Sequence, residues 1–131
     1  MTKYLILYGA CALIFFPIDF MWLSTMGKTF YQRELGGLLL PNPNLVIAGL
    51  FYLAYLVGVV VLVAVPAEGD VVKALFMGAL LGFVAYGTYD LTNLSTVQGF
   101  TPAVAAVDMA WGTVLTGVTA AGGVWIAKFF A

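Results

Sequence analysis

The chain has 131 residues, of which 63% are hydrophobic and only 8% are charged, and this composition excludes a water-soluble domain and predicts one all-α membrane domain. Its five basic and six acidic residues are spread along the chain without a basic run, which excludes nucleic-acid binding. With one cysteine and no histidine, the chain lacks the ligands and bases of zinc, haem and Ser/His/Asp chemistry, so we expect no metal and no cofactor.

Four apolar stretches are each long enough to cross a hydrocarbon core about 30 Å thick, which takes roughly 20 residues. They predict four transmembrane helices at about residues 4–25, 45–65, 71–93 and 102–129, in a single domain that spans residues 1–131. The first stretch follows Lys3, as the core of a signal peptide would. Its apolar run is too long for a signal core, so we expect a retained helix.

Helix start signals precede three of these spans. Asn42 and Thr101 each place a capping side chain before a proline, and Asp70 can cap the third span. The longest connection covers residues 26–44 and contains an amphipathic stretch, Phe30–Leu35. We expect this stretch to lie along the membrane surface.

The distribution of basic residues gives a topology. Lys3, Lys73 and Lys128 lie on the side that holds both termini, and Lys28 and Arg33 lie on the opposite side. By the positive-inside rule, this excess of one residue favours cytoplasmic termini in a multi-pass protein of a bacterial inner membrane.

Small residues recur at four-residue spacing, which lets helix backbones approach closely. The pairs are Ala54/Gly58, Gly78/Gly82 and, in the last span, Thr113/Gly117/Ala121. They favour either a compact bundle or the contact of a homodimer. The residues alone do not decide between the two.

One internal echo relates the halves of the chain. Asp19–Thr25 ends the first span and shares four residue types, in register, with Asp90–Thr96, which ends the third span. Odd-numbered helices run the same way through the membrane, so the echo predicts two parallel helix-pair repeats. Chance similarity is the alternative interpretation.

Three aspartates lie inside predicted spans: Asp19, Asp90 and Asp108. At ~1.5 Å rise per residue, they lie about 24 Å, 25 Å and 30 Å along their helices from the lysines at the other ends. The three carboxylates should therefore gather near one level. A charge in hydrocarbon costs ~3 kcal/mol or more, so each carboxylate should face protein or water.

Their helix faces carry further polar and aromatic side chains. Trp22 follows Asp19 by three positions and Trp111 follows Asp108 by three, while Tyr86 and Asn93 share a face with Asp90. The candidate ligand-binding residues are therefore Asp19, Trp22, Tyr86, Asp90, Asn93, Asp108 and Trp111. We expect a polar pocket with aromatic walls, covered by Lys28 or Arg33 from the long connection, or else carboxylates that share protons or hold a cation. The alternative is structural: wet carboxylates or interhelical hydrogen bonds, with tryptophans in the interfacial belt.

Five segments together resemble a bacterial family of predicted membrane proteins, domain of unknown function 2177. They are Pro17–Leu23, Phe30–Gly36, Phe51–Tyr55, Tyr86–Asn93 and Val107–Gly112. The resemblance covers nearly the whole chain, and its most specific element is the Thr-Tyr-Asp-Leu-Thr-Asn string. It implies a four-helix protein of a bacterial inner membrane and singles out the three aspartates, but it implies no activity.

Three functions remain open at this point. The first, which we favour, is transport or binding of a proton, a cation or a cationic amphiphile at the acidic cluster. The second is a lipid-modifying enzyme or subunit that uses an aspartate as acid or base with Tyr86 or Tyr89 as donor, which requires a partner to supply the chemistry. The third is a scaffolding subunit of a membrane complex.

Overall fold

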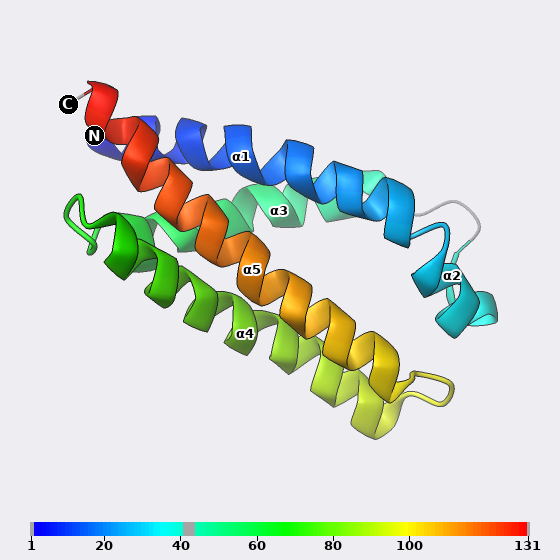
Figure 1. Cartoon of the computed structure of the whole chain (residues 1–131). Helices are drawn as coiled ribbons and strands as arrows, with labels where there is room; N and C mark the ends of the chain where they lie inside the picture. Colours follow the sequence, from blue (N-terminus) through cyan, green and yellow to red (C-terminus); the bar gives the residue numbers. More distant parts are fainter. Residues whose placement is uncertain (1, 41–43, 131) are drawn as a thin grey trace.

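The computed structural model describes residues 2–40 and 44–130 and contains helices and no strand within those ranges. Four long helices make up the bundle (Figure 1): α1 (Thr2–Met26), α3 (Leu45–Val59), α4 (Val71–Thr96) and α5 (Pro102–Ala127). Each is long and apolar enough to cross a membrane, α3 together with the turn that follows it to Ala64. The predicted all-α fold with four transmembrane helices is confirmed.

Short helical segments join the long ones. They are α2 (Phe30–Leu35), the 3₁₀ turn η1 (Gly36–Leu38), the π-helical turn η2 (Val60–Ala64) and the 3₁₀ turn η3 (Lys128–Phe130). In η2 the amide of Val65 donates to the carbonyl of Val60, five residues earlier, at 2.9 Å. In an α-helix the acceptor is only four residues earlier. The amphipathic stretch of the long connection thus forms α2, a helix of its own.

Side-chain caps begin three of the long helices. Asp70 accepts a hydrogen bond from the amide of Lys73, and Thr101 accepts one from the amide of Val104. Helix α3 is capped by Asn44, which accepts from the amide of Ile47. The expected capping pair of Asn42 and Pro43 lies outside the described residues.

Helices α4 and α5 form the tightest contact of the bundle. Glycines from both sides meet along what we call the glycine seam: Gly78 and Gly82 of α4, and Gly112 and Gly117 of α5. A Cβ atom on Gly78 would lie 2.8 Å from the carbonyl oxygen of Thr116, closer than packed atoms tolerate. The glycines of α4 and α5 therefore allow these two helices of one chain to pack closely. A side chain at these positions would prevent that approach.

Helix α1 packs along α5, and α3 is attached less closely. The core that joins them includes Phe15 of α1, Leu56 and Val59 of α3, and Leu115 of α5. The two helix pairs thus differ, because α4 and α5 pack along the glycine seam whereas α1 and α3 share few contacts. The parallel repeat stays a prediction.

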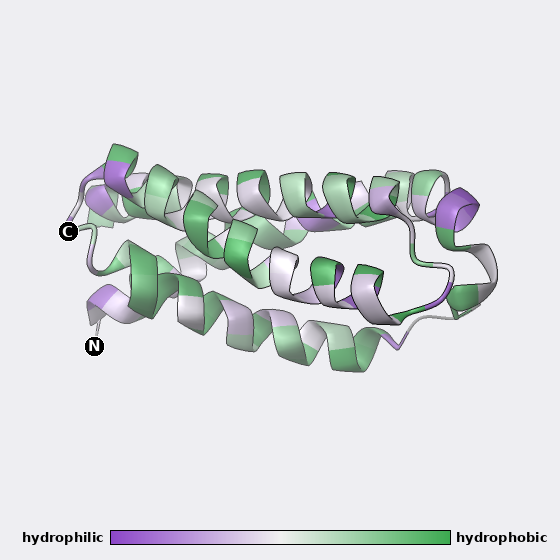
Figure 2. Ribbon diagram, turned by 90° about the horizontal axis from the view of Figure 1, so that it is seen from below, coloured by the Kyte–Doolittle hydropathy of each residue, from purple (hydrophilic) through white to green (hydrophobic). Residues whose placement is uncertain are grey.

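The outer surface is apolar along the helices. Figure 2 shows hydrophobic residues along the helical shafts and most of the hydrophilic ones toward the two ends of the bundle. Large hydrophobic side chains such as Leu13, Phe20, Phe76 and Leu80 are exposed, as expected for a surface covered by lipid. The N- and C-terminal ends of the chain lie at one end of the bundle, and α2 lies at the other (Figure 1).

Candidate functional site

Two tryptophans from different helices stack at the end of the bundle near α2. The ring centroids of Trp22 (α1) and Trp111 (α5) are 4.1 Å apart, with an angle of 6° between the ring planes. The indole N–H of Trp111 donates to the carboxylate of Asp19 at 3.3 Å. Asp19 is 4% exposed, so this carboxylate is held inside the bundle by a hydrogen bond from the opposite helix.

Tyr31 of α2 joins the same cluster from the long connection. Its hydroxyl donates to the Asp108 carboxylate at 2.9 Å and accepts from the indole N–H of Trp22 at 3.2 Å. Burial, and next the negative charge of Asp108, raise the pKa of the Tyr31 hydroxyl, so it remains a donor. One chain of contacts thus runs from Asp19 through Trp111, Trp22 and Tyr31 to Asp108.

Asp90 of α4 is the most enclosed of the three aspartates. Its side chain is 0% exposed, and neither carboxylate oxygen has a hydrogen-bond partner among residues 2–40 and 44–130. The carboxylate of Asp108 lies beside it. The two carboxylates therefore lie side by side, with Asp90 buried and Asp108 half-buried.

An aromatic cavity of about 440 Å³ opens next to this pair, between α3, α4 and α5. Asp108 lines it together with six residues: Phe51, Tyr52, Tyr55, Ala85, Tyr86 and Tyr89. Its shape is fixed in part by Tyr55, whose hydroxyl lies 2.8 Å from the hydroxyl of Thr116. No lysine or arginine of the described chain lines the cavity, so its net charge comes from Asp108.

The seven candidate residues are thus placed unequally. Asp19, Trp22, Asp108 and Trp111 share the chain of hydrogen bonds and ring contacts described above. Asp90 adjoins Asp108, and Tyr86 lines the cavity. Asn93 is half-buried and neither lines the cavity nor belongs to that chain of contacts.

A tyrosine, and not a basic residue, reaches the cluster from the long connection. Arg33 is 71% exposed and lies 3.7 Å from the carboxylate of its neighbour Glu34. Glu34 in turn accepts a hydrogen bond from Thr101, which attaches α2 to the start of α5. Lys28 is exposed as well. Within the described residues, the expected cover of the acidic cluster by Lys28 or Arg33 is therefore wrong, and Tyr31 contacts the cluster instead.

Sequence reasoning also missed the contribution of α3. Phe51, Tyr52 and Tyr55 supply one wall of the cavity, and all three lie in a segment already noted for its resemblance, Phe51–Tyr55. Tyrosines at positions 52 and 55 are three apart and so share a helix face, which is the signal that could have identified them. The predicted span at residues 45–65 contains no carboxylate, so this face was not identified as part of the candidate site.

The chain was also compared with known proteins. It matches no curated protein and no solved structure. Residues 4–125 match a family model described as a predicted membrane protein, DUF2177. Because that match covers nearly the whole chain, including all three aspartates and both stacked tryptophans, the protein belongs to the DUF2177 family of predicted membrane proteins.

Proposed function

We propose that this membrane protein binds a cationic amphiphile in the aromatic cavity and exchanges it for a proton held by Asp90 and Asp108. The observation that supports the proposal is the state of Asp90, which is fully buried with both carboxylate oxygens unpartnered in the described structure. A charged carboxylate is very unfavourable in such a place unless a cation or a proton accompanies it.

The neighbouring carboxylate makes the exchange reasonable. Asp90 and Asp108 are neighbours, and two neighbouring carboxylates hold one proton between them more readily than two negative charges. A cation that approaches Asp108 from the cavity takes over the role of that proton. Binding then releases a proton to water, so the affinity for the cation should rise with pH.

The walls of the cavity suit an organic cation better than a metal ion. Five of the seven lining residues are aromatic, and ring faces attract ammonium groups and other soft cations. A volume of about 440 Å³ falls within the range of small-molecule sites, roughly 300–1,000 Å³. No group of three or more acidic, cysteine or histidine residues placed to hold a metal ion occurs in the described ranges.

We also propose an orientation for the protein. Three lysines, at positions 3, 73 and 128, lie at the end that holds both termini, against Lys28 and Arg33 at the other. The positive-inside rule then supports cytoplasmic termini in a bacterial inner membrane. In this orientation the aromatic cavity lies nearer the outer face.

The experiment is binding of tetraphenylphosphonium to the purified protein in detergent, measured by calorimetry from mildly acidic to mildly alkaline pH. The wild-type affinity is expected to increase with pH. Asp108→Asn and Asp90→Asn remove charge but keep shape and hydrogen-bonding ability, so each should lose the pH-dependent binding, with affinity lower by about tenfold or more, equivalent to ~1.4 kcal/mol.

Glu68→Gln is the matched control, because it removes one carboxylate from an exposed position outside the cavity. Its binding should equal that of the wild type. Circular dichroism and thermal unfolding establish that each variant is folded. Absence of binding to the wild type, or unchanged binding in both aspartate variants, would exclude the cation site and leave the scaffolding function as the better hypothesis.

A further inference from the structure

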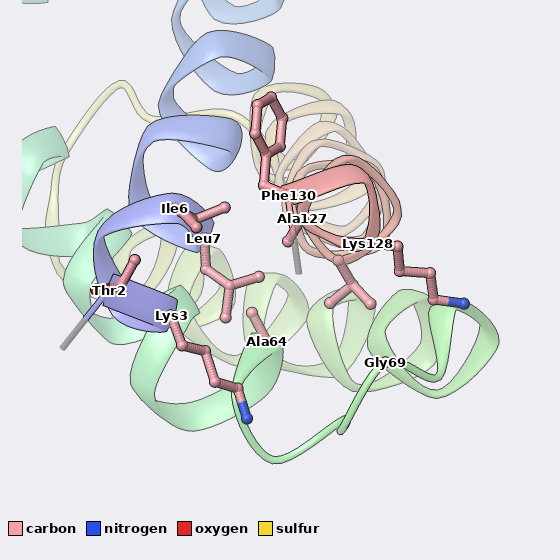
Figure 3. Close-up of a pocket in the computed structure, with 10 residues that line it drawn as sticks. Thr2, Lys3, Ile6, Leu7, Ala64, Gly69, Ala127, Lys128 and Phe130 are labelled. Carbon is pink, nitrogen blue, oxygen red and sulfur yellow. The ribbon is translucent and has the colours of Figure 1, made fainter.

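A second cavity lies at the opposite end of the bundle, where the N- and C-terminal ends of the chain meet. It also measures about 440 Å³ and opens between the start of α1, the end of α5 and the turn η2. Figure 3 shows Lys3 and Lys128 at its rim, on different helices, and apolar side chains between them. The apolar wall includes Leu7, Ala64, Val124 and Phe130.

The charge of this cavity is opposite to that of the aromatic one. Two lysines line it and no carboxylate does, among the described residues. Neither Lys3 nor Lys128 forms an ion pair within residues 2–40 and 44–130. Two acidic residues flank the lining residue Gly69: Glu68 is exposed, and Asp70 caps α4 through one carboxylate oxygen. Two ammonium groups without an ion-pair partner among the described residues therefore adjoin an apolar hollow.

We propose that this cavity binds an anionic phospholipid of the surrounding bilayer. The phosphate contacts the ammonium groups of Lys3 and Lys128, and the upper part of one acyl chain lies against the apolar wall. Basic pockets between transmembrane helices near the membrane surface are suited to anionic headgroups. Here Lys3 lies at the start of α1 and Lys128 lies directly after the end of α5, so we expect both lysines at the level of the headgroups and the apolar residues toward the hydrocarbon.

The location gives this lipid a structural effect. Lys3 belongs to the first turn of α1 and Lys128 to η3, which directly follows α5. A phosphate bound to the ammonium groups of both lysines would hold the two ends of the described chain together. The site is independent of the aspartates and of the aromatic cavity, so neither proposal depends on the other.

The experiment is native mass spectrometry of the full chain in mild detergent, with an equal mixture of phosphatidylglycerol and phosphatidylcholine of identical acyl chains. The wild type is expected to retain phosphatidylglycerol preferentially. The double variant Lys3→Gln/Lys128→Gln should lose this preference, by roughly fivefold for each lysine. Lys3→Arg/Lys128→Arg keeps both charges and should keep the preference.

Lys28→Gln/Lys73→Gln is the matched control, because it removes the same charge from residues that do not line the cavity. It should bind lipid as the wild type does. An equal loss in this control would assign the preference to overall charge. Retention of the preference in Lys3→Gln/Lys128→Gln would show that these two lysines do not hold the lipid, and either result would overturn the proposal. Displacement of the lipid by excess glycerol phosphate would also overturn it, because the acyl chain would then contribute nothing.

Discussion

The Asp90 side chain is held in surroundings that do not suit its charge. Within the described structure its two oxygens have no donor, although an unsatisfied buried polar group costs about 1–3 kcal/mol. We therefore expect this carboxyl group to be neutral or accompanied by a cation in the folded protein. A residue that weakens the fold in this way is a better candidate for binding than for packing, which argues against a purely structural role.

Asp90→Asn is expected to stabilise the protein at alkaline pH. The wild type must take up a proton or a cation when it folds, so its free energy of unfolding decreases as the pH rises, whereas the amide never requires a proton. The variant should exceed the wild type by about 1 kcal/mol at alkaline pH and equal it at acidic pH. Thermal unfolding in detergent across pH, without added cation, measures the difference. A variant less stable than the wild type at every pH would show that the carboxylate has a structural role.

Tyr31 connects two groups with one hydroxyl, since it accepts from Trp22 and donates to Asp108. Tyr31→Phe should therefore loosen α2 from the bundle without unfolding the long helices. Each lost interhelical hydrogen bond is worth ~0.6 kcal/mol, so amide hydrogen exchange within α2 should become several-fold faster. Tyr4→Phe, at an exposed position of α1, is the control and should leave exchange unchanged. Equal exchange in Tyr31→Phe would mean that Glu34 and Thr101 suffice to hold α2.

At the scale of helices, the glycine seam holds α4 and α5 together more firmly than any other pair. Gly78→Ala should destabilise the protein by roughly 1–3 kcal/mol, because its Cβ would overlap the backbone of α5. Gly58→Ala in α3 is the matched control, since nothing lies within 4 Å of the added Cβ. Thermal unfolding of the two variants in detergent compares them. Equal stability would contradict the assignment of the seam to packing within the chain.

The sequence predicted the helices well because hydropathy and caps are local properties. Asp70 and Thr101 begin their helices as expected, and the long connection forms an amphipathic helix at Phe30–Leu35. The contacts between helices are not local. The pairs Ala54/Gly58 and Gly78/Gly82 have the same spacing of small residues. That spacing does not reveal that only the second pair lies close to another helix.

The candidate site was predictable in part for the same reason. Trp22 follows Asp19 by three residues, and Trp111 follows Asp108 by three, so each pair lies on one helix face. The hydrogen bond, however, forms between helices, from Trp111 to Asp19. The contact of Tyr31 with Asp108 joins residues 77 positions apart. Such contacts depend on how helices rotate and pack, which periodicity within one helix does not determine.

At the scale of the whole molecule, the end of the bundle that holds the termini carries one basic residue more than the other end. The orientation proposed above predicts that a cysteine replacing Lys28 reacts with a membrane-impermeant maleimide in intact cells. A cysteine replacing Glu68, at the end that holds the termini, should react only after the cells are permeabilised. Cys11 is fully buried and should stay silent. The reverse pattern of labelling would invert the topology and place the aromatic cavity toward the cytoplasm.

Under the proposed function, the unequal attachment of the helices favours one route for a ligand into the aromatic cavity. Helix α3 buries side chains from Leu56 onward, whereas Leu45, Leu50 and Phe51 in its first half are exposed. We expect that half, which is attached to α1 by the hydrogen bond from the Tyr8 hydroxyl to the carbonyl of Leu53, to lean outward more easily than α4 and α5 separate, and the opening would then face the hydrocarbon of the bilayer. For the proposed cationic amphiphile, such a lateral route would admit molecules that have already partitioned into the membrane, so that solubility in lipid would select the ligand before the aspartates select its charge.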